Sequence, residues 1–329
     1  MTQALITGGA GFIGSHLTER LLAAGQTVTI IDDLSTGRLA NLAHLEGDAR
    51  LRVVVEDIRN TQVMDRLVSE CDVVYHLAAA VGVEKILSEP IATIEINIGG
   101  TEVVLKTARR YRKQVMLAST SEVYGKGVRF PFTEDDDTVM GATIRSRWSY
   151  ATTKAIDEFL ALAYHKEVGL PVVIFRLFNT VGPRQTGQYG MVLPRFVQAA
   201  LAGKPIQVYG DGEQSRCFCN VHDAVEAIYG LSQMPSAVGQ VFNVGSREEV
   251  SILELAKRVK ARAGSESEIR LIPYTEAYEA GFEDFRRRVP NIAKIQSMIE
   301  WEPTTTLDET IDQIIHYYRE KMNDGGNHT

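Results

Sequence analysis

Short apolar runs alternate with longer amphipathic stretches through the first half of the chain. Each apolar run is bounded by turn or polar residues, which is the pattern of a buried strand. The stretches between the runs are long enough for the helices that connect parallel strands. The expected strands are Ala4–Thr7, Thr27–Ile31, Leu51–Val55, Val73–Leu77, Val115–Ala118 and Val172–Phe175. The expected helices between them are Phe12–Ala24, Thr61–Ser69, Ile91–Arg110 and Tyr150–Val168. This alternation predicts an α/β fold with a parallel sheet covered on both faces.

The pattern loosens after Asn179, where glycine and proline become frequent. Gly182-Pro183, Gly203-Lys204-Pro205 and Gly210-Asp211-Gly212 mark turns between shorter elements. The polar tail at 323–329 has nothing to bury and is expected to fray. Helices are expected to resume at Val192–Ala202, Asp223–Ser232, Ile252–Ala263 and Leu307–Lys321.

The 329-residue chain is acidic, with a net charge of −7 and no basic cluster. This charge argues against a nucleic-acid partner or an anionic membrane surface. No apolar stretch reaches the ~20 residues of a membrane span, and the first residues run straight into a strand, so we expect a cytoplasmic protein. Cys71, Cys217 and Cys219 supply neither a disulfide framework nor a zinc site, and no metal is expected.

A glycine-rich turn joins the first strand to the first helix. Gly8, Gly11 and Gly14 let the backbone approach a pyrophosphate, whose charge then lies at the helix N-terminus beside Phe12 and Ile13. Asp32 ends the second strand, where its carboxylate can accept hydrogen bonds from the adenosine ribose and would repel a 2′-phosphate. Asp33 is the neighbouring alternative, although Asp32 better matches the strand end. The pattern therefore predicts NAD as the cofactor rather than NADP.

Further cofactor contacts are expected after the third and fourth strands. Asp57 and Ile58 are placed to frame the adenine, and Leu77-Ala78-Ala79 to line the pyrophosphate and ribose. We interpret His76, at the end of the fourth strand, as a packing histidine.

Tyr150 and Lys154 are four residues apart, which puts both side chains on one face of a helix. A free phenol titrates near pH ~10 and is a poor base at neutral pH. An ammonium beside it stabilises the phenolate and brings its pKa toward the working range. Beside a nicotinamide, such a phenol can take the proton of an alcohol while the ring takes the hydride.

Together these motifs resemble the extended short-chain dehydrogenase/reductases that act on nucleotide sugars. The resemblance covers nearly the whole chain and rests on Gly8-x-x-Gly11-x-x-Gly14, Asp32, Asp57, Asn97, Ser119-Thr120-Ser121-Glu122-Val123-Tyr124-Gly125 and Tyr150-x-x-x-Lys154. It implies that one NAD is kept and that C4 of the sugar is oxidised and later reduced. It implies that the Thr120 hydroxyl hydrogen-bonds the sugar O4 and that Tyr150 is the catalytic acid and base. It also makes Lys154 the residue that lowers the pKa of Tyr150 and holds the nicotinamide ribose.

The resemblance implies a Rossmann-like doubly wound sheet with a smaller, discontinuous C-terminal substrate domain. We expect residues 1–177 to form the NAD-binding domain, with 218–246 returning to it. Residues 178–217 and 247–321 are expected to bind the nucleotide sugar, and 322–329 to form a flexible tail. Members of the family usually dimerise through the two helices expected at Ile91–Arg110 and Tyr150–Val168, so a homodimer is expected.

Within the family, Ser121 and Glu122 resemble the UDP-glucuronate decarboxylases, because dehydratases have Asp-Glu after the threonine and epimerases usually lack the glutamate. Arg147, three residues before Tyr150, and Arg288, in a late segment at 281–290, agree with this likeness. Oxidation at C4 makes a β-keto acid of the C6 carboxylate, which then loses carbon dioxide. Ser121, Arg147 and Arg288 suit recognition of the carboxylate, and Glu122 is expected in the proton path.

Two other functions stay open at this stage. Gly82-Val83 is the dipeptide of epimerases, where xylose synthases have a proline-containing loop, so a UDP-sugar 4-epimerase is the alternative. A catalytically inactive NAD-binding module is a remote alternative, disfavoured because Thr120, Tyr150 and Lys154 are all present.

The nucleotide of a UDP-sugar is expected to contact residues of the second half of the chain. Asn179 follows the sixth strand and matches the family asparagine on the diphosphate or sugar. Arg216 ends a segment, 208–216, that resembles the nucleotide-binding loop, and Arg195 is a further candidate. Arginine suits this role because its planar fork binds phosphate oxygens in pairs. Arg286 and Arg287 are interpreted as surface partners of Glu283 and Asp284.

Overall fold

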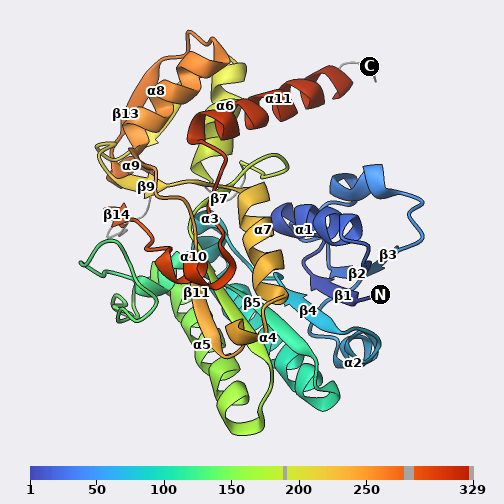
Figure 1. Ribbon diagram of the computed structural model, residues 1–329. Helices are drawn as coiled ribbons and strands as arrows, with labels where there is room; N and C mark the ends of the chain where they lie inside the picture. The colour runs from blue at the N-terminus through green and yellow to red at the C-terminus, as the bar shows by residue number, and fades with distance from the viewer. Residues whose placement is uncertain (188–190, 278–284, 326–329) are drawn as a thin grey trace.

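A seven-stranded parallel sheet forms the centre of the protein, with strand order β11-β6-β5-β4-β1-β2-β3 (Figure 1). The computed structural model describes residues 1–187, 191–277 and 285–325. The strands are β1 (Gln3–Thr7), β2 (Thr27–Asp32), β3 (Leu51–Val55), β4 (Val73–His76), β5 (Gln114–Thr120), β6 (Val172–Leu177) and β11 (Gln240–Val244). The six strands predicted from the apolar runs are all present, and the doubly wound α/β fold is confirmed.

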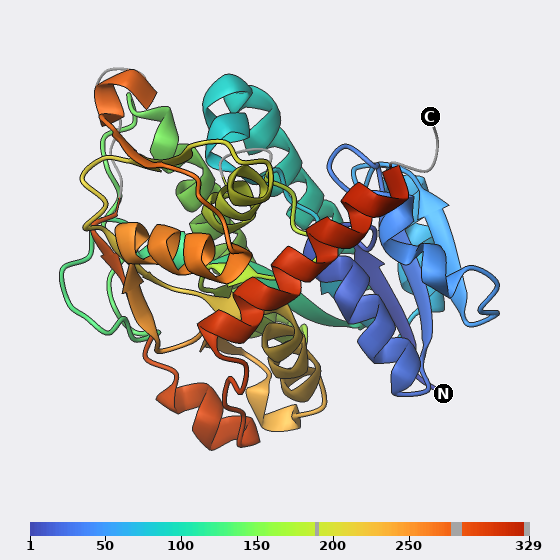
Figure 2. The same ribbon diagram turned by 90° about the horizontal axis from the view of Figure 1, so that it is seen from above.

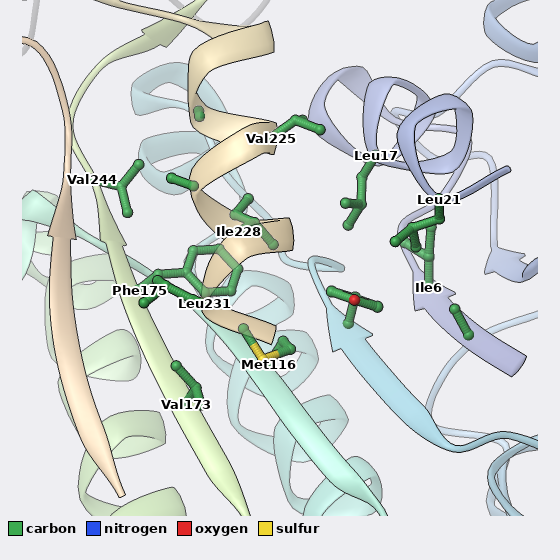
Figure 3. Packing of buried hydrophobic residues seen from close by; sticks show 14 of the residues in the cluster. Ile6, Leu17, Leu21, Met116, Val173, Phe175, Val225, Ile228, Leu231 and Val244 are labelled. Carbon is green, nitrogen blue, oxygen red and sulfur yellow. The ribbon is translucent and has the colours of Figure 1, made fainter. Parts of the chain in front are cut away.

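Successive residues of each strand point to opposite faces of the sheet, and each face is covered by helices. Ile6 of β1 packs under α1 (Phe12–Ala23), α7 (Val221–Ser232) and α10 (Ala293–Ile299). Figure 3 shows Leu17 and Leu21 of α1 and Ile228 of α7 meeting the strands on that face. Leu5, the neighbour of Ile6, faces the other side, toward α2 (Thr61–Glu70), α4 (Pro90–Tyr111) and α5 (Ser149–Val168). Burial on both faces explains why the strands are apolar throughout.

A second core, built from helices and short strands of the second half of the chain, lies above the carboxyl ends of the sheet (Figure 1). Three helices pack around it, α6 (Val192–Leu201), α8 (Ile252–Ala263) and α11 (Leu307–Gly325), with α11 crossing the molecule in the view from above (Figure 2). The short strands are β7 (Thr180–Val181), β8 (Ile206–Tyr209), β9 (Ser215–Cys217), β10 (Cys219–Asn220), β12 (Glu249–Ser251), β13 (Ile269–Ile272) and β14 (Arg287–Arg288). The short helices are η1 (Leu39–Leu45), α3 (Val83–Ser88), η2 (Ser121–Tyr124), η3 (Ser146–Trp148), η5 (Pro235–Ala237) and α9 (Tyr274–Ala277).

The direction of the chain across the sheet reverses at β1. From β1 the chain adds β2 and β3 on one side, and then crosses to add β4, β5 and β6 on the other. Crevices of open parallel sheets form outside the carboxyl ends of the strands at such a reversal. The glycine turn after β1, Asp32, Leu77, Thr120 and Asn179 all lie at or just beyond those ends.

The eight predicted helices agree with the structure to within two residues, except that α11 continues to Gly325. The predicted strand 73–77 ends one residue earlier, at His76. No helix among the described residues is long and apolar enough to cross a membrane. The three cysteines are buried and free, and the described residues contain no group of His, Cys, Asp and Glu that could hold a metal ion.

Candidate active site

One cavity of about 450 Å³ opens where the second core faces the carboxyl ends of the sheet strands. Its walls come from the glycine turn, the strand ends, the start of α5 and the short strands β8, β9 and β14. Every site residue predicted from the sequence lines this cavity: Gly8, Gly11, Phe12, Ile13, Gly14, Asp32, Asp57, Ile58, Leu77, Ala78, Ala79, Thr120, Ser121, Glu122, Arg147, Tyr150, Lys154, Asn179, Arg195, Arg216 and Arg288. The fold therefore brings the expected cofactor, catalytic and nucleotide residues to one place.

The turn after β1 has the shape of a phosphate cradle. Gly8 adopts a positive φ of 73°, and a side chain there would come within 2.9 Å of the backbone of Ala78. A Cβ on Gly14 would overlap the carbonyl oxygen of Gly8, so the helix can lie this close to the turn only with glycine at position 14. Gly11 is the N-cap of α1 and offers no side chain to its first turn. The first amides of α1 are thus directed at the cavity without an intrahelical acceptor, which fits a dinucleotide pyrophosphate.

Asp32 is buried at the end of β2 and organises the same turn. Its carboxylate accepts hydrogen bonds from the amides of Ala10, at 3.0 Å, and Leu34, at 2.9 Å. Burial raises the pKa of this carboxyl, and the two amide hydrogen bonds oppose the rise. Glycine at position 37 leaves room for the Asp32 carboxylate, because a Cβ there would lie only 2.6 Å from an oxygen of Asp32. An acceptor with remaining lone pairs therefore faces the cavity where the ribose hydroxyls are expected.

Asp57, expected to frame the adenine, is held by its neighbour Arg59. The Arg59 guanidinium donates to both carboxylate oxygens of Asp57, at 2.6 to 3.1 Å. This hydrogen bonding lowers the pKa of the Asp57 carboxyl. The pairing with Arg59 fixes the Asp57 carboxylate at the cavity wall beside Ile58. The sequence alone did not predict this pairing.

Tyr150 lies in the first turn of α5 with its phenol buried at the cavity. Burial raises the pKa of Tyr150, and the negative charges of Glu122 and Asp157 raise it further. A hydrogen bond from Thr120 and the positive charge of Arg147 act in the opposite direction. The sequence predicted that Lys154 lowers the pKa of this phenol. In the structure the Lys154 ammonium is also engaged elsewhere, in an ion pair with Asp157 at 2.9 Å.

Glu122 is the centre of a buried charge cluster beside Tyr150. Arg147 donates to both of its carboxylate oxygens, at 2.6 and 3.1 Å, and Arg288 approaches it to 3.6 Å. Burial alone would raise the pKa of Glu122, but Arg147, Arg288 and Arg216 together hold it below its ordinary value. Glu122 is therefore an ionised carboxylate surrounded by more positive than negative charge.

Residues 281–284 of the late segment lie outside the described residues, and residues within 285–290 contact this cluster. Phe285 is buried between two guanidinium groups, at 5.3 Å from that of Arg147 and 4.4 Å from that of Arg288. Arg288 also donates to the Ser121 hydroxyl, at 3.4 Å. These contacts align both arginines with the cavity.

The nucleotide candidates come from different elements, Arg195 from α6, Arg216 from β9 and Asn179 from just beyond the end of β6. Strand β14 pairs in parallel with β9, with Arg288 in register with Arg216, so two guanidinium groups share one short ladder at the cavity. Arg195 stacks on the Tyr209 ring at 4.0 Å and donates to the Gln207 carbonyl at 3.1 Å. Asn179 has a positive φ of 36° and donates to the Cys217 carbonyl, which ties the end of β6 to β9.

Two other motif residues are structural neighbours of the site. His76 is buried, with Nδ1 at 2.8 Å from the Thr7 hydroxyl and Nε2 at 3.1 Å from that of Thr101, in keeping with a packing role. Asn97 lies outside the cavity lining and binds both backbone groups of Ala80, as well as the Thr153 hydroxyl. Asn97 therefore fixes the loop that leads from β4 to the cavity.

Gly82, in the loop that resembles epimerases, lines the cavity with a φ of 113°. That conformation requires glycine whatever the reaction, so the residue has a structural reason to be present. The backbone of 83–88 forms α3.

Arg286 and Arg287 are exposed, as expected, but their described partners differ from the prediction. Arg286 pairs with Asp211 at 2.8 Å and Arg287 with Glu249 at 2.7 Å. Glu283 and Asp284, the predicted partners, lie outside the described residues.

The sequence analysis missed three residues near the site. Tyr274 of α9 lines the cavity and packs against Gly210, but it belongs to no motif. Gln214 lines the cavity and donates to the Tyr209 carbonyl. Asp157 follows Lys154 by three residues, a spacing that places it on the same helical face and was available as a signal.

Comparison with known proteins agrees with this geometry. Residues 5–314 match the family model described as GDP-mannose 4,6 dehydratase. The chain is 43% identical over 324 residues to the UDP-N-acetyl-alpha-D-glucosaminuronate decarboxylase of Bacillus cytotoxicus, covering 98% of this chain and 99% of that protein. It is 37% identical over 320 residues to UDP-glucuronic acid decarboxylase 1 of Xenopus tropicalis, covering 97% and 73%.

The fold is also similar to that of a solved UDP-glucuronic acid 4-epimerase from Bacillus cereus in complex with UDP-glucuronic acid and NAD. The TM-score is 0.88 at 28% identity, over 97% of this chain and 99% of that one. The relatives thus include both of the reactions that the sequence left open.

Proposed function

The chain belongs to the GDP-mannose 4,6 dehydratase family of extended short-chain dehydrogenase/reductases, and from this membership we propose that it is an NAD-dependent decarboxylase of a UDP-uronic acid. The expected substrate is UDP-glucuronate and the expected product UDP-xylose. The overall reaction is redox-neutral and breaks the bond between C5 and C6, which makes the enzyme a lyase. A 43% identical relative that acts on the N-acetylated uronate supports UDP-N-acetylglucosaminuronate as the second candidate substrate.

The observation that supports decarboxylation best is the charge cluster around Glu122. Three buried guanidinium groups, of Arg147, Arg216 and Arg288, act on the carboxylate of Glu122 at the cavity. Like charges at neighbouring positions of a strand pair are unfavourable without a counter-charge. A nucleotide sugar with a C6 carboxylate and a diphosphate carries negative charges that suit these guanidinium groups. A neutral hexose would bring no carboxylate to the part of this cluster beside Tyr150.

The residues around Tyr150 provide the chemistry at C4. NAD, held by the glycine turn and Asp32, would supply reversible hydride transfer at C4. The Thr120 hydroxyl, which hydrogen-bonds Tyr150, is placed to hold the sugar O4 against the phenol. Tyr150 takes the proton of the 4-hydroxyl as the ketone forms and gives it back when the ketone is reduced.

The Glu122 cluster then acts on C6. With a ketone at C4, the bond between C5 and C6 breaks, carbon dioxide leaves, and its electron pair remains as an enolate over C5, C4 and O4. Arg147, Arg288 and Ser121 orient the C6 carboxylate before it leaves. Because Glu122 is ionised, it is suited to hold a water that gives its proton to C5, and the hydroxide left behind takes a proton from solvent.

A product assay tests the proposal against its alternatives. Purified protein is incubated with UDP-glucuronate, and in parallel with UDP-N-acetylglucosaminuronate, without added reductant, and the sugar is followed by NMR. Loss of C6 with release of carbon dioxide supports decarboxylation, and the faster substrate identifies the uronate. Galacturonate signals with C6 retained would replace the proposal by 4-epimerisation. No turnover of either sugar by NAD-loaded protein would favour the inactive binding module.

We also propose that the enzyme is a homodimer whose subunits meet through α4 and α5. Ile91 of α4 and Phe159 of α5 are 72% and 71% exposed, and Ile94 and Ile156 are exposed beside them. Apolar side chains gathered on two adjacent helices are typical of an interface between subunits. Sedimentation of the wild type and of Phe159→Glu tests this proposal, with a monomeric variant expected. The division into two domains and the cytoplasmic location stay predictions of the sequence.

A further inference from the structure

Lys154 and Asp157 form an ion pair that is almost completely shielded from water. The Lys154 ammonium donates to Asp157 Oδ2 at 2.9 Å, and the two side chains are 4% and 1% exposed. Removing two charges from water costs several kcal/mol per ion, and a buried pair is often no more stable than apolar residues of the same size. Within the described residues, Asp157 Oδ1 has no hydrogen-bond partner, which adds to that cost. Stability alone therefore gives little reason for a carboxylate at this position.

A chain of buried polar groups supports the pair from the side of the sheet. The Thr101 hydroxyl of α4 favours the ionised form of Asp157 and lies 3.1 Å from His76 Nε2. His76 Nδ1 lies 2.8 Å from the Thr7 hydroxyl, and this hydroxyl accepts a hydrogen bond from the amide of Ala78.

Because His76 is neutral, this chain brings no second charge to the pair. Burial and the nearby Lys154 charge lower the pKa of His76 to about 3. The network therefore positions Asp157 without competing for the ammonium.

The charges that face the phenol come from three elements. Glu122 of η2 and Arg147 of η3 act on the Tyr150 phenol with opposite signs, and Asp157 acts on it from α5. Lys154 of α5 is paired with Asp157, His76 of β4 faces Lys154, and Glu158 faces Asp157. Asp157 therefore adds to the negative charge of Glu122 beside the phenol, and the Lys154 ammonium is the cation paired with it.

We propose that Asp157 is a positioning residue of this active site, which holds the Lys154 ammonium and through it controls the protonation of the Tyr150 phenol. The functional unit on α5 is then Tyr150, Lys154 and Asp157, rather than the tyrosine and lysine alone. Asp157 limits the stabilisation that Lys154 gives to the phenolate, so that Tyr150 keeps its proton until substrate is in place. The inference rests on the proposed function only for the role of Tyr150 as acid and base.

A direct titration of Tyr150 tests this inference without relying on turnover. NAD-saturated full-length protein is titrated by ultraviolet difference absorbance of the tyrosinate, each form being measured against the same form with Tyr150→Phe. Asp157→Asn keeps the size of the side chain and removes its charge. We expect it to move the Tyr150 titration about one pH unit lower, in line with the loss of one nearby charge. The acid limb of the kcat profile should move in the same direction, with KM for the nucleotide sugar nearly unchanged.

Thr101→Val provides a second variant if Asp157→Asn does not fold. It removes the hydroxyl that favours ionised Asp157, so the shift is smaller and in the same direction. Thr107→Val, on the same helix but bonded only to the backbone of α4, is the matched control and should leave the titration in place. A Tyr150 titration that coincides with the wild type in a folded Asp157→Asn protein, or in Thr101→Val if the first does not fold, overturns the inference. A shifted titration without turnover of any UDP-uronate would instead count against the proposed function alone.

Discussion

The Arg147 guanidinium donates two hydrogen bonds to the carboxylate of Glu122, at 2.6 and 3.1 Å, and both residues line the same cavity as Tyr150. The pair joins η3 to η2, two short helices that both precede Tyr150 in the sequence. Since removing one partner of a buried pair leaves an uncompensated charge, each of these residues affects both stability and chemistry. This pairing also keeps Glu122 ionised before substrate binds.

Glu122→Gln should separate oxidation at C4 from the loss of carbon dioxide. The amide keeps one acceptor for Arg147 but cannot relay a proton to C5. We expect carbon dioxide release to slow by about 100-fold, in the range for general acid–base groups. The 4-keto sugar formed by oxidation at C4 should then accumulate. Stopped-flow absorbance of the reduced nicotinamide, together with carbon dioxide release, measures the two steps. Unchanged product formation would remove Glu122 from the proton path.

Tyr150→Phe should nearly abolish turnover while the protein still binds NAD. The substitution removes only the hydroxyl, and the buried ring keeps its packing in the first turn of α5. Calorimetric titration with NAD and a product assay under saturating substrate provide the two measurements. Activity within about tenfold of the wild type would exclude Tyr150 as the acid and base, because such groups contribute about 100-fold or more.

Gly14→Ala should weaken NAD binding and destabilise the fold, because its Cβ would overlap the Gly8 carbonyl in the phosphate turn. Gly99→Ala is the matched control, since it is also helical and its Cβ would meet only the Arg59 side chain at 4.0 Å. In a helix, alanine is favoured over glycine by about 0.5–1 kcal/mol, so the control should be slightly stabilised. Urea unfolding and NAD titration are measured for both. Equal effects of the two substitutions would contradict the close approach at Gly14.

Acidification should destabilise the protein partly through two buried histidines. Burial lowers the pKa of His76 to about 3 and that of His16 to about 4, from an ordinary 6.5. Between those values and pH 6.5 the unfolded chain binds more protons than the folded one, so stability falls as the pH falls. Each histidine contributes up to about 1.4 kcal/mol per pH unit in that window.

Urea unfolding of His16→Gln from pH 6.5 to 4.5 measures this effect. The variant should lose stability less steeply than the wild type, while His316→Gln, which alters an exposed histidine, should follow the wild type. A slope for His16→Gln equal to that of the wild type would show that His16 does not titrate on unfolding in this range.

Much of the fold is predictable from the sequence, because strand and helix periodicity are local properties. The apolar runs around Ile6 and Ile30 must be buried on both faces, and such runs alternating with amphipathic stretches allow few folds other than a doubly wound sheet. Gly8 and Gly14 were recognisable for the same reason, since the turn they form lies within a few residues. The boundaries of β4 and α11 were less certain, because hydrogen bonding at element ends depends on neighbours in space.

The sequence by itself determined the elements, the phosphate turn and the spacing of Tyr150 and Lys154. Only the tertiary structure decided which charges surround the phenol. Ser121 and Arg288 are 167 residues apart, and they meet because β14 pairs with β9 above the end of β5. The tertiary structure also changed the electrostatics that the motif spacing had suggested. Lys154 forms an ion pair with Asp157, and Arg147 keeps Glu122 ionised. Interactions between charges depend on their distance and shielding from water, and packing of segments far apart in the sequence sets both.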